Sequence, residues 1–130
     1  MIQGVGTDLV EIARFAALVE RHGERLARRV LALEEMDAFI HTSDKPRFLA
    51  KRFAAKEAFG KATGMGIRAP VLLTSMWIGH DMHGKPSLFT KGELQALVER
   101  ERWQISLSIS DEREYALAFV VIDILVGERE

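Results

Sequence analysis

Residues 48–64, FLAKRFAAKEAFGKATG, place a single acid, Glu57, among four lysines and arginines and a series of alanines and phenylalanines. At 100° per residue on a helix, Glu57 falls beside Phe53 and one turn before Lys61, and the cations are distributed around the whole helix. One interpretation is an exposed Glu57–Lys61 ion pair, which stabilises a helix by about 0.2–0.5 kcal/mol. A helix with no clean polar face is, however, hard to bury on any single side.

A second acid, Asp8, stands in the N-terminal segment MIQGVGTDLVEI, whose alternating pattern predicts a strand over residues 2–12. Alternation puts Asp8 on the same face as Val10, with Thr7 on the other face. A carboxylate on an apolar face is costly unless it is paired, bound to a metal, or accepts backbone hydrogen bonds at a strand end. Glycines at positions 4 and 6 would let another backbone or a ligand come close.

Asp8 and Glu57 together suit a hard divalent cation. Mg²⁺ is commonly held by one or two carboxylates, and phosphate oxygens and waters complete its octahedron. Lys61 and Arg52 would then face phosphate, because a metal combined with lysine or arginine stabilises phosphoryl displacement. The residues alone therefore predict metal-assisted phosphate chemistry.

The elements that would position these residues follow an irregular order. Glycine and proline positions together with hydrophobic periodicity predict helices, strands and a final hairpin. A break between two helices is expected at Gly23, a turn between strands at DMHGKP and the turn of the final hairpin at DERE. Because strands and helices do not alternate, we expect an α+β fold with a mainly antiparallel sheet and packed helices, in a single domain over residues 1–130. After the first strand the expected elements are two helices within residues 13–40, a helix from about Arg47 to Gly64, strands near 72–80 and 87–89, a helix over 91–101 and hairpin strands 103–110 and 115–126.

Composition excludes several classes of protein. The 130 residues are 48% hydrophobic and carry a net charge of −1, so the whole molecule is not a polycation for nucleic acid. The absence of cysteine excludes disulfides, thiolate nucleophiles and zinc–thiolate sites. No signal peptide and no apolar run of about 20 residues is visible, so we expect a cytoplasmic protein outside the membrane.

The two segments GVGTDLVEIARF and RFLAKRFAAKEAFGKATG resemble the holo-acyl-carrier-protein synthase family, the short bacterial 4′-phosphopantetheinyl transferases. The likeness continues through ERLARRVL, GKP and SLSISDEREYALAFVV, so it covers nearly the whole chain. It implies transfer of 4′-phosphopantetheine from coenzyme A to a serine of apo-acyl carrier protein, with release of adenosine 3′,5′-bisphosphate, for fatty acid biosynthesis. It also implies a Mg²⁺ cofactor and a homotrimer with active sites at the subunit interfaces.

The resemblance also assigns roles to residues. Asp8 and Glu57 match the metal ligands, and Lys61 matches the lysine near the transferred phosphate, so Glu57 and Lys61 are the expected catalytic residues. Either Glu57 or a metal-bound water could accept the serine proton. The residues similar to those that hold the nucleotide phosphates are Lys45, Arg47, Arg52, Gly84, Lys85 and Pro86.

A basic patch lies in the first two expected helices, where residues 14–29 hold five arginines and only two acids. Such a run is ordinarily a solvated helix face. Acyl carrier proteins are strongly acidic, however, and the resemblance implies that the carrier docks on the first helix, beginning at Arg14. Electrostatic steering favours this interpretation. The expected docking residues are Arg14, Arg21 and Arg25. We expect the arginines of this patch to lie away from the cluster of Asp8, Glu57 and Lys61.

One departure from the family concerns the segment SISDERE, where many members carry a histidine just before the acid. In this chain Ile109 and Ser110 precede Asp111. We assign no catalytic role to any of the histidines, His22, His41, His80 and His83. Two alternative functions stay open: a different Mg²⁺-dependent nucleotide-cleaving enzyme, and a non-catalytic trimeric module that binds acidic proteins.

Overall fold

The computed structural model describes residues 1–126. Its elements, in chain order, are β1 (Ile2–Glu11), α1 (Ile12–His22), α2 (Glu24–Val30), α3 (Leu33–His41), α4 (Lys45–Thr63), the 3₁₀ turn η1 (Leu73–Ser75), β2 (Met76–His80), β3 (Pro86–Thr90), α5 (Gly92–Glu101), β4 (Trp103–Asp111) and β5 (Tyr115–Ile124).

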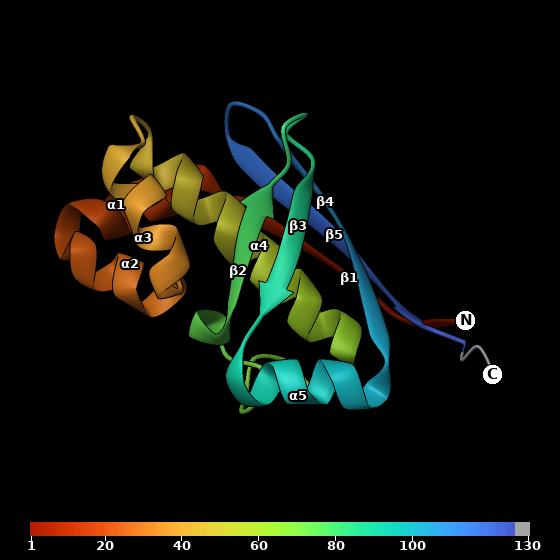
Figure 1. Ribbon diagram of the computed structural model, residues 1–130. Helices are drawn as coiled ribbons and strands as arrows, with labels where there is room; N and C mark the ends of the chain where they lie inside the picture. Colours follow the sequence, from red (N-terminus) through yellow and green to blue (C-terminus); the bar gives the residue numbers. More distant parts are fainter. Residues whose placement is uncertain (127–130) are drawn as a thin grey trace.

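The strands form two antiparallel sheets (Figure 1). Strand β5 is the centre of the larger sheet, with β1 on one side and β4 on the other. Ala118 of β5 lies opposite Asp8 of β1 and opposite Ile109 of β4. Strands β2 and β3 form the smaller sheet. The predicted α+β class with a mainly antiparallel sheet is confirmed.

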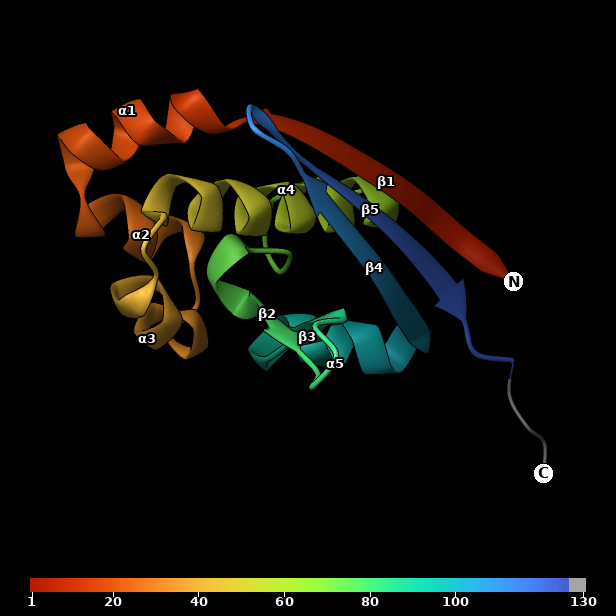
Figure 2. The ribbon, with the colours of Figure 1, turned by 90° about the horizontal axis from the view of Figure 1, so that it is seen from above.

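Helix α4 lies between the two sheets, as the view from above shows (Figure 2). It packs along β1 and β5 on the inner face of the larger sheet, and its Ala54 and Ala58 are fully buried there. Small side chains let the helix approach the sheet closely, and Phe59 packs edge-on against Trp103 of β4. Helices α1 to α3 gather near the N-terminal end of α4.

The N-terminal helical region differs from the prediction. The strand ends at Glu11, because Ile12 already begins α1, and three helices replace the two expected. The second break falls at Ala32, whose extended backbone separates α2 from α3. The side chain of Glu35 accepts a hydrogen bond from the Ala32 amide at 3.0 Å, and so satisfies a backbone group at the start of α3.

Helix α4 begins two residues before the predicted start at Arg47. Asp44 caps it, because its carboxylate accepts a hydrogen bond from the Arg47 amide at 3.1 Å. Pro46 is tolerated in the first turn, where its missing N–H has no partner to lose. The helix ends at Gly64 as predicted, in the left-handed conformation that glycine adopts without strain.

Within residues 1–126, none of the helices combines the length and the apolar character needed to cross a membrane.

Candidate active site

Two glycines of β1 bring the strand and α4 into direct backbone contact. A Cβ at Gly4 would lie 1.9 Å from the carbonyl oxygen of Ala62, and one at Gly6 would lie 2.0 Å from that of Ala58. No side chain fits at either position, so glycine is required for this packing. The glycines are expected to let another backbone or a ligand come close, and in the structure the backbone of α4 does so.

Asp8 is the next residue on the same face of β1 after Gly6, and it meets α4 there. Gly6 and Val10 are buried while Thr7 and Leu9 are exposed, as alternation predicts. The Asp8 side chain keeps 17% of its surface exposed, enough for a ligand to reach it. Asp8 therefore lies at the rim of the helix–strand contact.

Lys61 crosses from α4 to β1. Its Nζ lies 3.2 Å from Asp8 Oδ1 and donates a hydrogen bond to the Thr7 carbonyl oxygen at 2.9 Å. Within the described part of the chain, Lys61 makes no ion pair with Glu57, so the simple i,i+4 pair is not formed. The lysine instead links the helix to the carboxylate of the strand.

Glu57 lies near enough to Asp8 for the two carboxylates to repel each other. Burial raises the pKa of Glu57, and the negative charge of Asp8 raises that pKa further, while Lys61 and then Arg14 lower it. Two carboxylates that disfavour each other's charge attract a divalent cation, which would relieve the repulsion.

The donor set fits Mg²⁺. Within residues 1–126 no group of three or more histidines, cysteines or acids is placed to hold a metal. The candidate ligands are the carboxylates of the pair Asp8 and Glu57. Mg²⁺ is commonly bound by one or two carboxylates, with water and substrate phosphate in the other positions. Asp8 and Glu57 are thus suited to a metal that is shared with a phosphate substrate.

Arg14 is part of this neighbourhood. Its guanidinium carbon lies 5.8 Å from the centre of the Phe15 ring and 5.9 Å from that of Phe53, and its charge lowers the pKa of Glu57. The prediction that the basic patch stands apart from the acid cluster is therefore wrong for Arg14, because α1 packs on α4.

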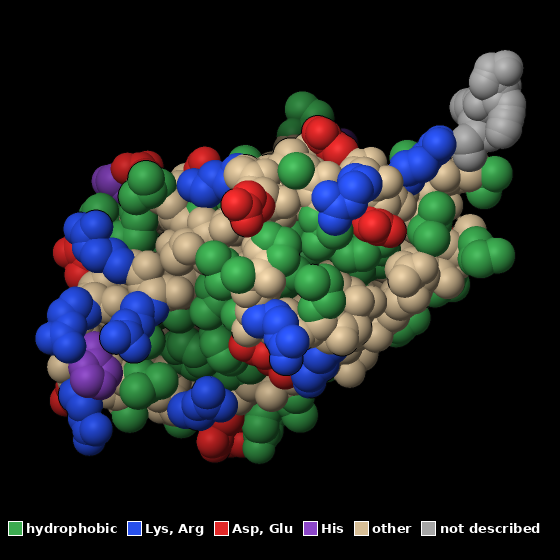
Figure 3. All heavy atoms as spheres, turned by 90° about the horizontal axis from the view of Figure 1, so that it is seen from below, with side chains coloured by type: hydrophobic (Ala, Val, Ile, Leu, Met, Phe, Trp, Pro, Cys, Tyr) green, Lys and Arg blue, Asp and Glu red, His purple; other side chains and the backbone are tan. Residues whose placement is uncertain are grey.

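The rest of the basic patch lies along α1 and α2. Lysine and arginine side chains gather over the end of the molecule that carries these helices (Figure 3). Arg25 lines a hollow of about 240 Å³, together with Leu18, His22, Leu26 and Arg29. A shallow basic surface with an apolar floor lies there.

A buried ionic cluster on the opposite side of α4 centres on Glu35. Glu35 Oε1 accepts a hydrogen bond from Lys56 Nζ at 2.6 Å, and Oε2 accepts one from the Ile78 amide at 2.8 Å. Lys56 is fully buried and also donates to the carbonyl oxygens of Val30 and Leu73, so all three of its N–H groups are used.

Arg52 joins this cluster. Its Nε lies 3.2 Å from Glu35 Oε2 without hydrogen-bond alignment, and its guanidinium carbon lies 3.9 Å from the centre of the Phe48 ring. Burial lowers the pKa of both Lys56 and Arg52, and the Glu35 carboxylate offsets part of that effect. Lys56 and Glu57 are neighbours in sequence, but one is structural and the other is available to a ligand.

Comparison with known proteins identifies the family. The chain matches the 4′-phosphopantetheinyl transferase superfamily (ACPS) over residues 4–120. The chain belongs to this superfamily. It is 54% identical to the holo-[acyl-carrier-protein] synthase of Laribacter hongkongensis, over 95% of this chain and 99% of the relative.

Two solved structures of holo-[acyl-carrier-protein] synthases share the fold of this phosphopantetheinyl transferase. The crystal structure from Neisseria meningitidis has a TM-score of 0.90 and 44% identity, and covers 95% of this chain and 99% of its own. The structure from Bacillus anthracis, in complex with coenzyme A (3′,5′-ADP), has a TM-score of 0.81 and 32% identity, and covers 96% and 99%.

Three of the residues expected to hold nucleotide phosphates, Lys45, Arg47 and Arg52, occupy three different places in the transferase. Lys45 donates hydrogen bonds to the carbonyl oxygens of Ile40 and Thr42 and lies over the Phe39 ring. Arg52 belongs to the buried cluster. Arg47 contacts the tip of the β4–β5 hairpin, and its side chain bonds to Asp44 and Asp111. A nucleotide role for these three residues remains a prediction.

Gly84 and Lys85 lie in the turn between β2 and β3, and Pro86 is the first residue of β3. The carboxylate of Asp81 accepts hydrogen bonds from the amides of His83 and Lys85, and Gly84 has a φ of 84°, which glycine adopts without strain. Their expected contact with the nucleotide is likewise a prediction.

Sequence reasoning missed the two acids that pair with cations of α4, namely Glu35 and Asp111. One signal was present: the cations surround the helix, so some of them had to be buried or paired. The identity of the partners could not be read from that pattern, because Glu35 is 21 residues from Lys56 and Asp111 is 64 residues from Arg47.

Proposed function

We propose that this protein is a holo-[acyl-carrier-protein] synthase. It transfers 4′-phosphopantetheine from coenzyme A to a serine of apo-acyl carrier protein and releases adenosine 3′,5′-bisphosphate, a step that supports fatty acid biosynthesis. Relatives with this name align over nearly the full length of the chain. The cytoplasmic location expected from the sequence remains a prediction.

The observation that carries the proposal is the meeting of Asp8, Glu57 and Lys61 at the contact between β1 and α4. Two mutually repelling carboxylates beside a partly exposed lysine form a site for a metal-bound pyrophosphate. Mg²⁺ held by Asp8 and Glu57 would neutralise pyrophosphate charge and orient the phosphorus for attack.

The chain's own residues have separable tasks in the transfer. The serine hydroxyl loses its proton to a base, for which Glu57 is one candidate. The serine oxygen forms a new bond to the phosphorus that carries pantetheine, and the bond from that phosphorus to adenosine 3′,5′-bisphosphate breaks. Lys61, more than half exposed, can turn from Asp8 towards the transferred group and stabilise its negative charge. Glycine-mediated packing of α4 on β1 keeps these groups in register, which reduces the entropic part of the barrier.

Carrier docking is assigned to the basic surface of α1 and α2. Arg25 and Arg29 offer forked donors at a hollow that Leu18 and Leu26 also line, which suits an acidic helix with one apolar side chain. Arg21 lies on the same helix as Leu18. Arg14 lies between this surface and Glu57, so it is placed to guide the carrier serine towards the reacting phosphorus.

A homotrimer is favoured by the outer face of the larger sheet. Val5 and Leu9 of β1 and Leu117 and Phe119 of β5 are exposed there, on the face away from α4. A continuous apolar surface on the outer face of a sheet is commonly covered by another subunit. Because β1 is an edge strand of this sheet, a subunit that covers its outer face also lies along the strand that carries Asp8.

The proposal is tested by measuring adenosine 3′,5′-bisphosphate released from coenzyme A, with and without Mg²⁺ and apo-acyl carrier protein. We expect release only when both are present. Release without the carrier would favour a different nucleotide-cleaving enzyme. Carrier binding with no release would favour a non-catalytic module.

A further inference from the structure

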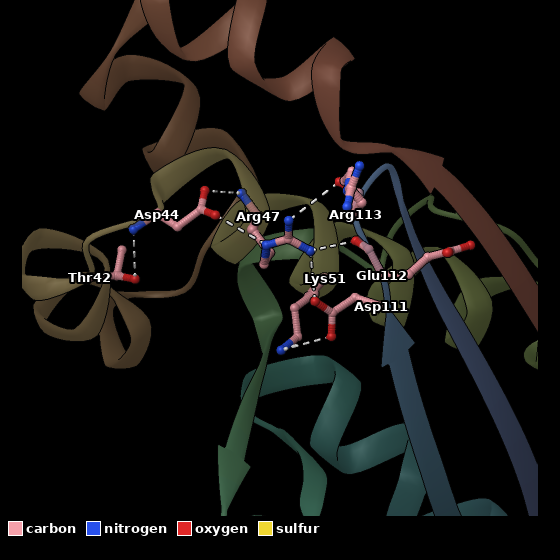
Figure 4. A network of polar contacts seen from close by, with 7 residues as sticks. All are labelled: Thr42, Asp44, Arg47, Lys51, Asp111, Glu112 and Arg113. Atoms are coloured by element: carbon pink, nitrogen blue, oxygen red, sulfur yellow. Dashed lines mark hydrogen bonds and ion pairs between the residues drawn. The ribbon is translucent and has the colours of Figure 1, made fainter.

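A carboxylate at the tip of the β4–β5 hairpin, that of Asp111, pairs with two cations of α4. Asp111 Oδ2 accepts a hydrogen bond from Arg47 Nη1 at 2.8 Å, and Asp111 Oδ1 lies 3.5 Å from Lys51 Nζ (Figure 4). Arg47 and Lys51 lie one helical turn apart and face the same way. Asp111 is therefore bound as a ligand anion would be, between a guanidinium and an ammonium group.

The contact is close to solvent. The side chains of Arg47, Lys51 and Asp111 keep 30%, 33% and 27% of their surfaces exposed. An exposed ion pair contributes little to stability, because water competes with both partners. A dissolved anion can reach these cations without unfolding the hairpin.

Arg47 has other contacts that would persist without Asp111. Its Nε donates to Asp44 Oδ2 at 3.1 Å, and its Nη1 donates to the carbonyl oxygen of Glu112 at 2.6 Å. The guanidinium therefore stays attached both to the start of α4 and to the hairpin. Exchange of Asp111 for another anion would leave the fold in place.

The surroundings favour a second anion. Burial lowers the pKa of His80 at the end of β2, and the positive charges of Arg52 and Lys51 lower it further. A cationic field therefore extends from α4 to the neighbouring β2–β3 hairpin.

Sheet register relates this cluster to the candidate active site. Asp111 lies opposite Ala116, which lies opposite Val10, and Asp8 is two residues further along β1. At usual strand spacings the Cα atoms of Asp111 and Asp8 are about 12 Å apart, on the same face of the sheet. A nucleotide with phosphate groups at two positions of its ribose can span that distance.

We propose that Asp111 is an exchangeable internal anion, which holds Arg47 and Lys51 in the free protein and is replaced by a phosphate group of coenzyme A. The inference rests on the proposed function. A phosphate dianion offers more acceptor oxygens and more charge to the guanidinium fork than a carboxylate does, so exchange is favourable. The free energy needed to displace Asp111 lowers the affinity for the nucleotide, and Asp111 thus sets how tightly substrate and product bind.

The test is calorimetric titration of adenosine 3′,5′-bisphosphate into the wild-type protein, Asp111→Asn and Glu112→Gln. Asparagine keeps the shape of the side chain and removes its charge. Glu112→Gln is the matched control, because it makes the same change in net charge one residue away, and only the backbone of Glu112 contacts Arg47. We expect Asp111→Asn to tighten binding about three- to fivefold, as release of exposed ion pairs allows, and Glu112→Gln to leave it unchanged.

A second measurement uses the unmodified protein, so it does not depend on the folding of a variant. The carboxyl-carbon resonance of Asp111 should shift on addition of the bisphosphate and saturate in parallel with the calorimetric curve, while that of Asp81 stays constant. An unmoved Asp111 resonance at saturation, unchanged or weaker binding by Asp111→Asn, or equal tightening by both variants would overturn the proposal. Absence of binding by wild type and Asp111→Asn alike would overturn the coenzyme A function together with it.

Discussion

Two ionic clusters on opposite sides of α4 differ in how completely their charges are satisfied. Lys56 is fully buried and has an acceptor for every proton, in α2, α3 and η1. Glu57, the next residue, faces β1, where burial and the charge of Asp8 both raise its pKa. Helix α4 therefore contributes Lys56 to a buried cluster that organises the fold, and Glu57 to a carboxylate pair with Asp8 that is open to a cation.

The contrast shows why adjacent charges on one helix need separate explanations. A buried polar group with all its partners rigidifies the structure around it, and its removal leaves uncompensated charges. Carboxylates held close together store repulsion, and a ligand of opposite charge can use that repulsion for binding. Substitutions on the two sides should therefore separate activity from stability.

The largest effect is expected on the rate of transfer, from substitutions in the carboxylate pair Asp8 and Glu57. Asp8→Asn or Glu57→Gln should reduce Mg²⁺-dependent transfer by at least about a thousandfold, because each removes a charge from the metal site. A raised pKa means that ionised Glu57 opposes folding once the pH exceeds that pKa. Glu57→Gln should therefore leave the free energy of unfolding at pH 7 unchanged or increase it. Steady-state kinetics and urea denaturation measure the two quantities, and near-normal turnover at limiting Mg²⁺ would contradict the assignment.

A substitution in the buried cluster around Glu35 should instead lower the free energy of unfolding. Glu35→Gln removes the only acid beside Lys56 and Arg52 among the described ion pairs, and should lower the free energy of unfolding by about 3 kcal/mol. Urea denaturation compares it with Glu34→Gln, which alters an exposed acid in the same helix. If both variants lose less than about 1 kcal/mol, the buried cluster is not what stabilises the packing of α3 on α4.

The docking surface should show a smaller effect, on binding alone. Arg25→Glu places repulsion in the basic patch and should weaken apo-carrier binding about tenfold, with little change in coenzyme A binding. Arg14→Glu should affect both, because Arg14 also acts on Glu57. Calorimetry with each partner, repeated at higher salt, checks this separation. An Arg25→Glu protein with normal carrier affinity would remove α2 from the docking surface.

The smallest effect is expected at the exposed turn between β2 and β3. Hydrogen bonds from the Lys85 and His83 amides hold the pKa of Asp81 below its ordinary value of 3.8. Their stabilising contribution is present above that ordinary value and is lost as the pH falls through the lowered one. The amide resonance of Lys85, which donates directly to Asp81, should therefore show the shift caused by Asp81 only in acid stronger than about pH 4. The same shift in Asp81→Asn would show that another group is responsible.

Prediction from sequence succeeded where the backbone sets the pattern. Strand alternation placed Asp8 on the inner face of β1, Gly64 marked the end of α4, and the irregular order of elements indicated an antiparallel α+β fold. Prediction failed at Ala32, where the break between α2 and α3 depends on Glu35, a side chain that also binds Lys56 and β2.

The sequence by itself thus determined the fold class, the face on which Asp8 lies and the family to which the chain belongs, because periodicity, breakers and motifs are local properties of the chain. Only the tertiary structure decided which charges meet. Lys61 pairs with Asp8 across 53 residues rather than with Glu57 across four, and Arg47 reaches Asp111 across 64 residues. Partner choice depends on how closely α4 approaches the sheet, and that distance is set by packing at Gly4 and Gly6.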